Sequence, residues 1–296
     1  MPRLPLAALG FAALGLAAGA PPDPLDSLRA ELLAGINEAR PAGKPLVLSP
    51  VLCRVAQARA QELSRSGRNP RDAALAEASD AATRAGYDSR SLSEVFIEAD
   101  GDIPMILATF VRGEGPLARE AAREPLRDLG IGFVLRGEQP PLYVFLFGLA
   151  WPDYLSAKRA ELGNLSRVRR ELLERINQER ARIQLAPLRP DPKLDAAAQG
   201  HAQDMLARSY FGHNSPERDT VLERSKQAGY RPQYVGENLA EGQDTFDSVV
   251  AGWMASPVHR EHILSPVFSD LGSGLAIGDN KRGHEILWVQ VFGRSR

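Results

Sequence analysis

The sequence contains one pattern twice, and this repeat limits what the chain can fold into. The segment Leu32-Leu-Ala-Gly-Ile-Asn-Glu-Ala-Arg40 matches Leu172-Leu-Glu-Arg-Ile-Asn-Gln-Glu-Arg180. Further matches follow in the same order with small gaps: Pro50, Leu52, Ala56 and Gln57 with Pro192, Leu194, Ala198 and Gln199; Ala85-Gly-Tyr87 with Ala228-Gly-Tyr230; Glu94 with Glu237; Asp128-Leu-Gly130 with Asp270-Leu-Gly272. Chance likeness of two amphipathic helices does not explain an ordered series. We therefore expect two homologous domains in tandem, residues 25–150 and 164–296, joined by a linker at 151–163.

The first twenty residues differ from the rest of the chain. Arg3 precedes an almost wholly apolar run from Leu4 to Ala17, and small residues follow at 18–20. This pattern predicts a signal peptide over residues 1–20, or an uncleaved anchor, and hence a secreted or periplasmic protein. The run is short for a transmembrane helix, which needs about 20 apolar residues. We expect no membrane span beyond this segment.

Composition excludes some classes of function. The 296 residues include 44% hydrophobic and 25% charged residues, as in ordinary soluble domains. The formal net charge of -1 gives no basic face for a nucleic acid, so we expect no nucleic-acid partner. The single cysteine, Cys53, cannot form an intrachain disulfide and is expected to be a small buried hydrophobe.

Hydrophobic spacing predicts an α+β fold. Val168, Leu172 and Ile176 recur at helical spacing, and Asp191-Pro192 is typical of a helix start. The segments 272–277 and 286–292 are strand-like and are separated by a turn-rich stretch. Helices with a few late strands predict helices packed on a small sheet in each half.

The second half carries a series of short motifs. In order, these are Tyr210-Phe-Gly-His213, Gly236-Glu237-Asn238-Leu-Ala240, Ser256-Pro-Val-His259-Arg260 and Trp288-Val-Gln290-Val-Phe-Gly293. Together they resemble the CAP superfamily (SCP/PR-1-like proteins) in its bacterial form without disulfides. The resemblance covers about 130 residues and implies an α-β-α sandwich with an open cleft lined by His and Glu, so the whole chain would be two such sandwiches after the signal segment.

The chemistry of the second half centres on His213, Glu237 and His259. Two imidazoles and one carboxylate can make an open three-ligand site for a divalent cation such as zinc or magnesium. The same trio without metal can bind a polar group through hydrogen bonds. The resemblance implies that the three converge in one cleft, with Ser256, Asn238 and Gln290 beside them.

Structural roles compete with these assignments. Glu237 could organise its own loop through backbone amides, and His213 and His259 could cap helix ends. The sequence also departs from the four-residue His and Glu cluster of many eukaryotic relatives: Leu287-Trp288 stands where a second His is expected, and Ser256 where a helix Glu is expected. For the other histidines we expect His201 to be buried, His262 to orient its helix and His284 to be solvated. Trp253 and Trp288 are expected in the core or the cleft wall.

The first half lacks the corresponding chemistry. All five histidines lie after residue 200. Glu94 matches Glu237, but Ser93 and Val95 replace the flanking Gly and Asn, and Phe145 stands where Gln290 would fall. We expect this half to keep the fold without the site, as a structural or partner-binding copy.

Three kinds of function remain open. The first is an extracytoplasmic binding module whose second cleft holds a divalent cation or small ligand, with an unknown small ligand or cell-envelope component as partner. The alternative is a metal-assisted hydrolase of peptide or cell-envelope substrates with Glu237 as general base. The third is a scaffold that only presents surfaces. The sequence has no HExxH motif and no nucleophile elbow, which favours binding over catalysis.

Overall fold

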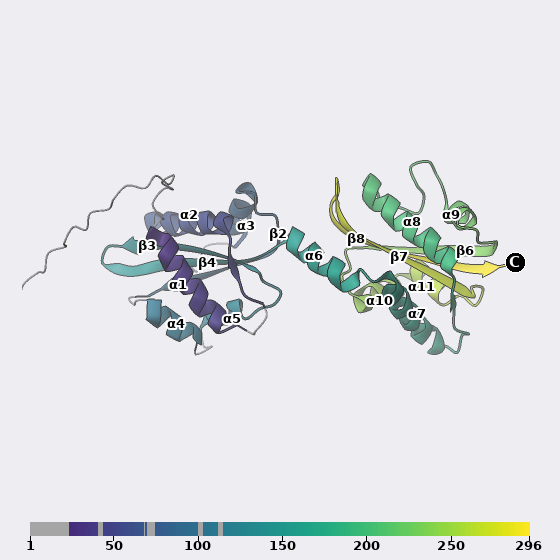
Figure 1. Ribbon diagram of the computed structural model, residues 1–296, viewed down its shortest axis with the longest axis horizontal. Coiled ribbons are helices and arrows are strands. Elements are labelled where there is room, and N and C mark those ends of the chain that lie inside the picture. The colour runs from purple at the N-terminus through teal and green to yellow at the C-terminus, as the bar shows by residue number, and fades with distance from the viewer. Residues whose placement is uncertain (1–23, 41–43, 68, 70–74, 100–102, 112–114) are drawn as a thin grey trace, which may run out of the picture. The chain divides into compact units, whose positions relative to one another are not determined.

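The structure is a computed structural model that describes residues 24–40, 44–67, 69, 75–99, 103–111 and 115–296 (Figure 1). The expected signal segment lies outside these residues. The chain divides into two compact units, the first ending at Gly148 and the second spanning Leu149–Arg296. Among the described helices, none has the length and apolar character needed to cross a membrane.

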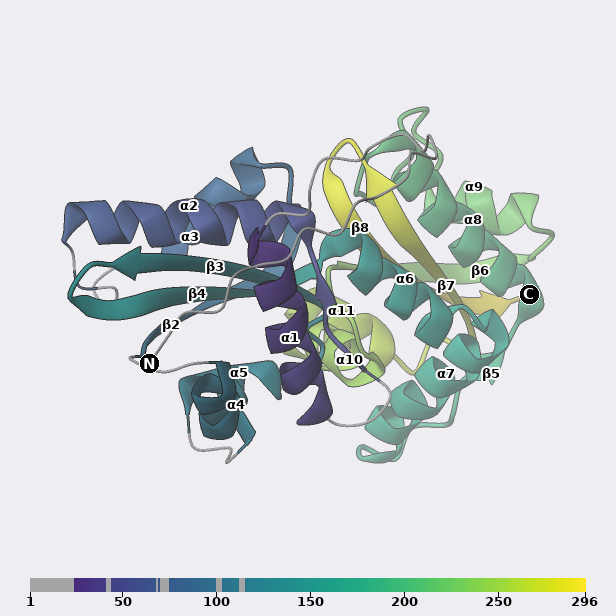
Figure 2. The ribbon, with the colours of Figure 1, turned by 60° about the vertical axis from the view of Figure 1, so that its left-hand side comes forward.

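The first unit holds one mixed sheet with helices on both faces. Its elements are α1 (Pro24–Glu38), β1 (Val47–Leu48), α2 (Pro50–Ser66), α3 (Leu75–Arg84), β2 (Ser89–Glu98), α4 (Ile103–Val111), α5 (Pro116–Ala121), β3 (Asp128–Arg136) and β4 (Gln139–Ala150). The strand order is β1-β3-β4-β2, with β1 parallel and β4 antiparallel to β3. Helices α2 and α3 cover one face, and α1, α4 and α5 the other (Figure 2).

The second unit has the corresponding strand order, β5-β7-β8-β6. Its elements are α6 (Trp151–Leu162), α7 (Leu165–Ala181), β5 (Arg189–Pro190), α8 (Pro192–Arg208), α9 (Val221–Gln227), β6 (Pro232–Glu241), α10 (Phe246–Ala255), α11 (Pro257–Ile263), β7 (Asp270–Asn280) and β8 (Gly283–Ser295). As predicted, Asp191 caps α8, accepting hydrogen bonds from Lys193 and Leu194, with Pro192 in the first turn.

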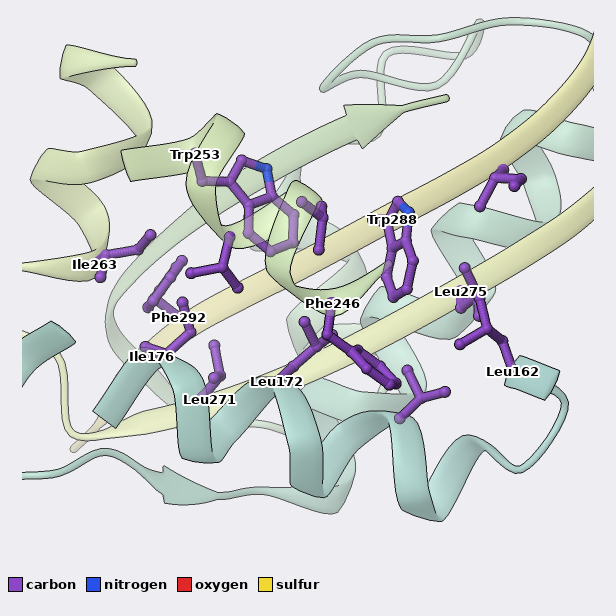
Figure 3. Packing of buried hydrophobic residues seen from close by; sticks show 14 of the residues in the cluster. Leu162, Leu172, Ile176, Phe246, Trp253, Ile263, Leu271, Leu275, Trp288 and Phe292 are labelled. Carbon is purple, nitrogen blue, oxygen red and sulfur yellow. The ribbon is translucent and has the colours of Figure 1, made fainter. Parts of the chain in front are cut away.

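Two hydrophobic cores hold the layers of the second unit together. On one face of the sheet, Leu194, Ala198 and Met205 of α8 pack on alternate residues of β8, among them Val289 and Val291. On the other face, α7, α10 and α11 pack on the intervening residues, as Figure 3 shows for Leu172, Trp253, Ile263, Trp288 and Phe292. Successive residues of a strand point to opposite faces, so β8 contributes to both cores. The two tryptophans are core residues, as expected.

The segment 151–163, expected to be a linker, forms a helix instead. Helix α6 follows β4 directly, and Pro152 stands in its first turn, where proline is tolerated. Its residues Tyr154, Leu155 and Leu162 are buried in the core of the second unit. The apolar residues of this segment therefore extend the second unit toward the N-terminus.

At one edge of each sheet, a glutamine side chain makes the hydrogen bonds that a neighbouring strand would otherwise make. In the second unit β5 covers only the first two residues of β7, and beyond them Gln199 donates to the carbonyl of Leu275 and accepts from its amide. In the first unit Gln57 makes the same two bonds to Phe133. A glutamine side chain thus substitutes for a neighbouring peptide group at both edges.

Candidate functional site

Strand β6 is the edge strand that carries the Gly-Glu-Asn motif. Glu237 pairs with Val291 and Asn238 with Gln290 in the register with β8. Val291 belongs to the core under α8, so Glu237 faces α8 and α9. Asn238 and Gln290 face α10 and α11 on the opposite side. Sequence reasoning missed β6 because its glycine and polar residues do not follow the usual alternation of a strand.

The Glu237 carboxylate is buried and both of its oxygens are engaged. The side chain is 2% exposed. Oε1 lies 3.0 Å from Nδ1 of His213, and Oε2 accepts a hydrogen bond of 2.7 Å from Nη2 of Arg224. Since an ionised carboxylate only accepts, the His213 ring donates through Nδ1. The His213 side chain is 59% exposed, so one end of the pair is buried and the other reaches solvent.

Arg224, which sequence reasoning did not select, connects the parts of the site. It lies on α9, whose start is fixed by a capping box between Thr220 and Glu223. Besides Glu237, its guanidinium donates to the carbonyls of His213 and Asp219. The signal that could have found it is its place on a short capped helix just before the Gly-Glu-Asn strand, where a buried carboxylate needs a cation.

His201 lies next to Glu237 on the buried side of the His213–Glu237 contact, and it supports the loop that precedes His213. It is buried, as expected, and its Nε2 donates to the carbonyl of Gly212 over 3.0 Å. The same nitrogen is 3.9 Å from Oε1 of Glu237. Burial is the largest effect on the pKa of His201 and lowers it, while the negative charge of Glu237 raises it by less. A neutral ring that donates through Nε2 holds the loop in place without adding charge to the site.

Two further histidines lie on α11, next to the other face of β6. Asn238 is fully buried, donates to the carbonyl of His259 and accepts from Nδ1 of His262 at 2.9 Å. Burial is the main cause that lowers the pKa of both His259 and His262, and the charge of His213 lowers both further. Rings with a pKa below the ordinary 6.5 are neutral at pH 7. His262 orients β6 against α11, which agrees with its expected helix-orienting role.

The six predicted site residues therefore do not share one cleft wall. His213 and Glu237 are in direct contact, and His259 lies within electrostatic range of His213. Ser256 is the half-buried residue between α10 and α11, and its side chain caps neither helix. Gln290 is fully buried between the core residues of β8, and its side-chain amide has no hydrogen-bond partner among the described residues. Asn238 thus supports the site from inside through its bonds to His259 and His262.

The described residues do not form a preassembled metal centre. Within these parts of the chain, no group of three or more His, Cys, Asp or Glu side chains is arranged to hold a metal ion. A metal ion bound to Glu237 would lie beside its bonds to Arg224 and His213, and the nearby guanidinium repels a cation. The carboxylate does not fit a three-ligand zinc or magnesium centre, so the cation site stays a prediction.

The first unit has a closed counterpart of this site. The Glu94 side chain, 3% exposed, accepts from Nε and Nη2 of Arg59. Nη1 of Arg59 donates to Glu77 of α3 and to Glu62. Arg59 stands two residues after Gln57, as His201 stands two residues after Gln199. A guanidinium from α2 thus occupies the position that an imidazole from α8 takes in the second unit.

Comparison with known proteins places the second unit in a family. Residues 173–292 match the family described as CAP, the cysteine-rich secretory protein family. The uncharacterized protein YkwD of Bacillus subtilis is 34% identical over 129 residues, which cover 44% of this chain and 48% of that protein. The uncharacterized membrane protein YlbC of the same organism is 30% identical over 106 residues, or 36% of this chain and 31% of YlbC. The chain therefore spans about half or less of these curated relatives.

Among solved structures, the chain is similar to an extracellular protein containing a SCP domain from Bacillus anthracis. It is 19% identical, the match covers 73% of this chain and 71% of that chain, and the TM-score is 0.40. An outer surface protein from Borrelia burgdorferi is 22% identical, with 42% of this chain and 90% of that chain covered and a TM-score of 0.39. The family match over 173–292 and the sequence likeness to YkwD show that the second unit of this chain is a CAP-family (SCP/PR-1-like) domain.

Proposed function

We propose that the second unit is an extracytoplasmic, non-enzymatic binding module that holds a small polar ligand at the edge of β6. The binding surface is the imidazole cluster, defined as His213 and His259, and His262 is a positioning residue that bonds Asn238. One observation carries this proposal: the exposed His213 ring is held through Nδ1 by the buried Glu237 carboxylate. A ring fixed in this way keeps the tautomer in which Nε2 is an acceptor for a ligand.

The charges of the site favour a ligand that donates hydrogen bonds. Glu237 and Arg224 neutralise each other in a buried pair. The rings of His259 and His262 are neutral at pH 7 because their pKa values are lowered. Neutral imidazole nitrogens accept from hydroxyl, amide or ammonium groups, and they can also ligate a divalent cation. Cation binding would then use the imidazoles, with Glu237 as the group that orients His213.

The hydrolase alternative finds less support. A general base needs a carboxylate oxygen that can take a proton from water. Both oxygens of Glu237 already accept hydrogen bonds, one of them from the guanidinium of Arg224. Glu237 is better suited to positioning His213 than to proton transfer.

For the first unit we propose a degenerate copy of the same domain. The repeat in the sequence and the matching strand orders support a duplication. So do paired contacts that serve no ligand: Asn37 bonds both the amide and the carbonyl of Leu46, and Asn177 does the same with Leu188. Because Arg59 fills the place of His201, this copy would have kept the fold and lost the site.

Export is the remaining part of the proposal. It is supported by the apolar run from Leu4 to Ala17, which is typical of a signal peptide. Relatives described as an extracellular protein and an outer surface protein are compatible with it.

The imidazole cluster can be tested by NMR with ¹⁵N-labelled histidine. The full chain is titrated with zinc, with magnesium and with a set of small polyols and amines, and the five ring signals are followed. Binding at the cluster should shift His213 and His259 and should be lost in the His213→Ala/His259→Ala variant. His284→Ala is the matched control, because His284 bonds Asp279 in the β7–β8 turn. Equal binding by both variants would place the ligand elsewhere.

The same experiment separates binding from catalysis. Glu237→Gln keeps the size of the side chain but weakens the hold on His213. If binding weakens while peptide, ester and peptidoglycan substrates remain uncleaved by both proteins, the module interpretation stands. Turnover by the wild type that is lost in Glu237→Gln would establish the hydrolase instead.

A further inference from the structure

A cavity of about 370 Å³ lies at the C-terminal end of α7 in the second unit. It is lined by the last turn of α7, the loop that follows it, the loop before β7 and the end of β8. Three of the lining residues are arginines, Arg180, Arg189 and Arg294, and no described Asp or Glu belongs to the lining. The lining shares no residue with the imidazole cluster, and the volume is within the range of sites that hold small molecules.

Arg180 brings a guanidinium group to this cavity from the protein interior. The residue is 1% exposed. Its Nε donates to the carbonyl of Ala186, and its Nη1 donates to the carbonyls of Ile263 and Ser265. Nη2 has no hydrogen-bond partner among the described residues, and it is not among the side-chain atoms that are both buried and unpaired. Nη2 is therefore the guanidinium nitrogen that reaches the open space of the cavity.

The positive charge of Arg180 has no carboxylate partner among the described residues. Burial lowers the pKa of Arg180, and no neighbouring acidic group raises it again. Carbonyl groups balance a buried cation less well than a full negative charge does. An anion that contacts Nη2 would therefore be favoured, and guanidinium groups bind the oxygens of phosphate and carboxylate groups through charged hydrogen bonds.

The first unit shows the same arginine without an open cavity beside it. Arg40 matches Arg180 in the sequence repeat, and its Nη2 donates to the carbonyl of Leu126 over 3.2 Å. Burial lowers the pKa of Arg40, the charge of Glu124 raises it, and the charge of Arg127 lowers it by a smaller amount. In the first unit the protein itself thus supplies both the acceptor and the negative charge.

Three replacements make the corresponding place in the second unit more cationic. Asp128 pairs with Gly148 in one sheet and Asp270 with Gly293 in the other, which fixes the correspondence between the two units. By this correspondence Pro266 replaces Glu124, Arg189 replaces Val47 and Arg294 replaces Leu149. Of the three cavity arginines only Arg189 has a carboxylate partner among the described residues, Asp270 at 3.1 Å. Three guanidiniums and one carboxylate leave an excess of two positive charges, which a dianion would balance.

We propose that the cavity at the end of α7 binds a dianionic phosphate group, either free or as the monoester of a small molecule. Its oxygens accept hydrogen bonds from Nη2 of Arg180 and from the guanidinium of Arg294. The site is independent of the imidazole cluster, because no histidine lines the cavity. A failure of this proposal would leave the proposed function of the second unit untouched.

Isothermal titration calorimetry of the full chain tests the proposal at constant ionic strength and at about pH 8, where phosphate is mainly a dianion. The probes are inorganic phosphate, glycerol 3-phosphate and, as a monoanion, acetate. We expect saturable binding of phosphate and binding of acetate that is weaker by about tenfold or more. Glycerol 3-phosphate that binds more tightly than free phosphate would identify a monoester as the ligand, and weaker binding would identify free phosphate.

Variants that restore residues of the first unit locate the binding. Arg294→Leu should weaken phosphate binding by about tenfold, because one charged hydrogen-bond donor is lost. Pro266→Glu places a carboxylate near Arg180, so it should abolish phosphate binding and raise the Tm of the second unit. Arg170→Leu is the matched control, because Arg170 is an exposed arginine of α7 that does not line the cavity.

Four results would overturn the proposal. The absence of saturable phosphate binding would mean that solvent alone satisfies Nη2 of Arg180. Equal affinity for acetate would mean a site without preference for a dianion. Equal weakening by Arg294→Leu and Arg170→Leu would mean that phosphate responds only to the net charge of the protein. A Pro266→Glu protein that binds phosphate as tightly as the wild type would place the ligand elsewhere.

Discussion

Glu94 and Glu237 occupy matching places in the two units, and both are buried carboxylates paired with a guanidinium. In the first unit the guanidinium comes from the long helix α2, through Arg59. In the second it comes from the short helix α9, through Arg224, and His201 stands where Arg59 would be. A buried carboxylate needs a positive partner in either case. When the guanidinium comes from the long helix, it takes the position that the imidazole of His201 has in the second unit.

The difference extends to the surroundings of each pair. Arg59 contacts three carboxylates, so its site is filled by the chain itself. Arg224 contacts one carboxylate and two carbonyls, and the other oxygen of Glu237 is left for His213, which reaches solvent. The first unit thus has an arginine on its long helix and a closed ion-pair network, where the second unit has a histidine and an open polar site.

The largest expected effect comes from removing the closed pair. Arg59→Met leaves Glu94 buried without its cation and should destabilise the first unit by about 3–5 kcal/mol. Urea unfolding followed by hydrogen exchange in β2 and β3 would measure it. The double variant Arg59→Met/Glu94→Leu removes both charges and should recover most of the loss. Equal destabilisation of the single and double variants would show that Arg59 acts through Glu62 and Glu77 instead.

A transplant tests whether the two arrangements are interchangeable. Arg224→Ala should destabilise the second unit by roughly 2–3 kcal/mol, because Glu237 loses a charged hydrogen bond but keeps His213. Adding His201→Arg supplies a guanidinium from α8, as Arg59 does from α2, and should restore about 1–2 kcal/mol. All three tryptophans lie in the second unit, so their fluorescence during unfolding reports it selectively. If adding His201→Arg restores no stability, the comparison between the two carboxylates fails.

Acid should affect the second unit through its histidines. Folding lowers the pKa of His201, His259 and His262, in each case mainly by burial. The unfolded chain, with pKa values near 6.5, then binds more protons below that pH, so stability falls as the pH drops from 7 toward 5. Tryptophan-monitored unfolding would measure the loss. His201→Gln should flatten the dependence, and an unchanged slope would contradict this assignment.

The smallest expected effect concerns one helix position. Gly200→Ala should stabilise the second unit by about 0.5–1 kcal/mol, since the helix gains propensity and the added methyl meets no atom. The reverse change in the first unit, Ala58→Gly, should cost a similar amount. Thermal unfolding of both variants measures the pair. A destabilising Gly200→Ala would mean that the glycine serves packing.

The sequence predicted the helices better than the site. The α8 start at Asp191-Pro192 and the strands around Gly272 and Trp288 were readable because capping and apolar runs are local signals. The contact of His213 with Glu237 could be expected only from family resemblance. Arg224 and the inward-facing Gln290 were missed or misplaced, because strand register and the pairing of a distant helix with a buried charge are tertiary features.

The segment 151–163 was also assigned wrongly, because its structure depends on tertiary packing that the sequence does not show. Its alternating small, charged and apolar residues have little helical periodicity, and the proline near its start suggested a break. Only the apolar surface offered by β7 and α7 explains why Leu155 and Leu162 are buried there. Tertiary packing, more than propensity, makes this segment a helix.

The glutamines at the sheet edges have a consequence for the solubility of the protein at high concentration. An open strand edge is a template for pairing with another chain, and such pairing leads to aggregation. Gln57 and Gln199 already occupy the amide and the carbonyl that an incoming strand would need at Phe133 and Leu275. Replacing either glutamine with leucine would leave that strand edge open to pairing, and the unit that carries the change would be expected to lose solubility before it loses its fold.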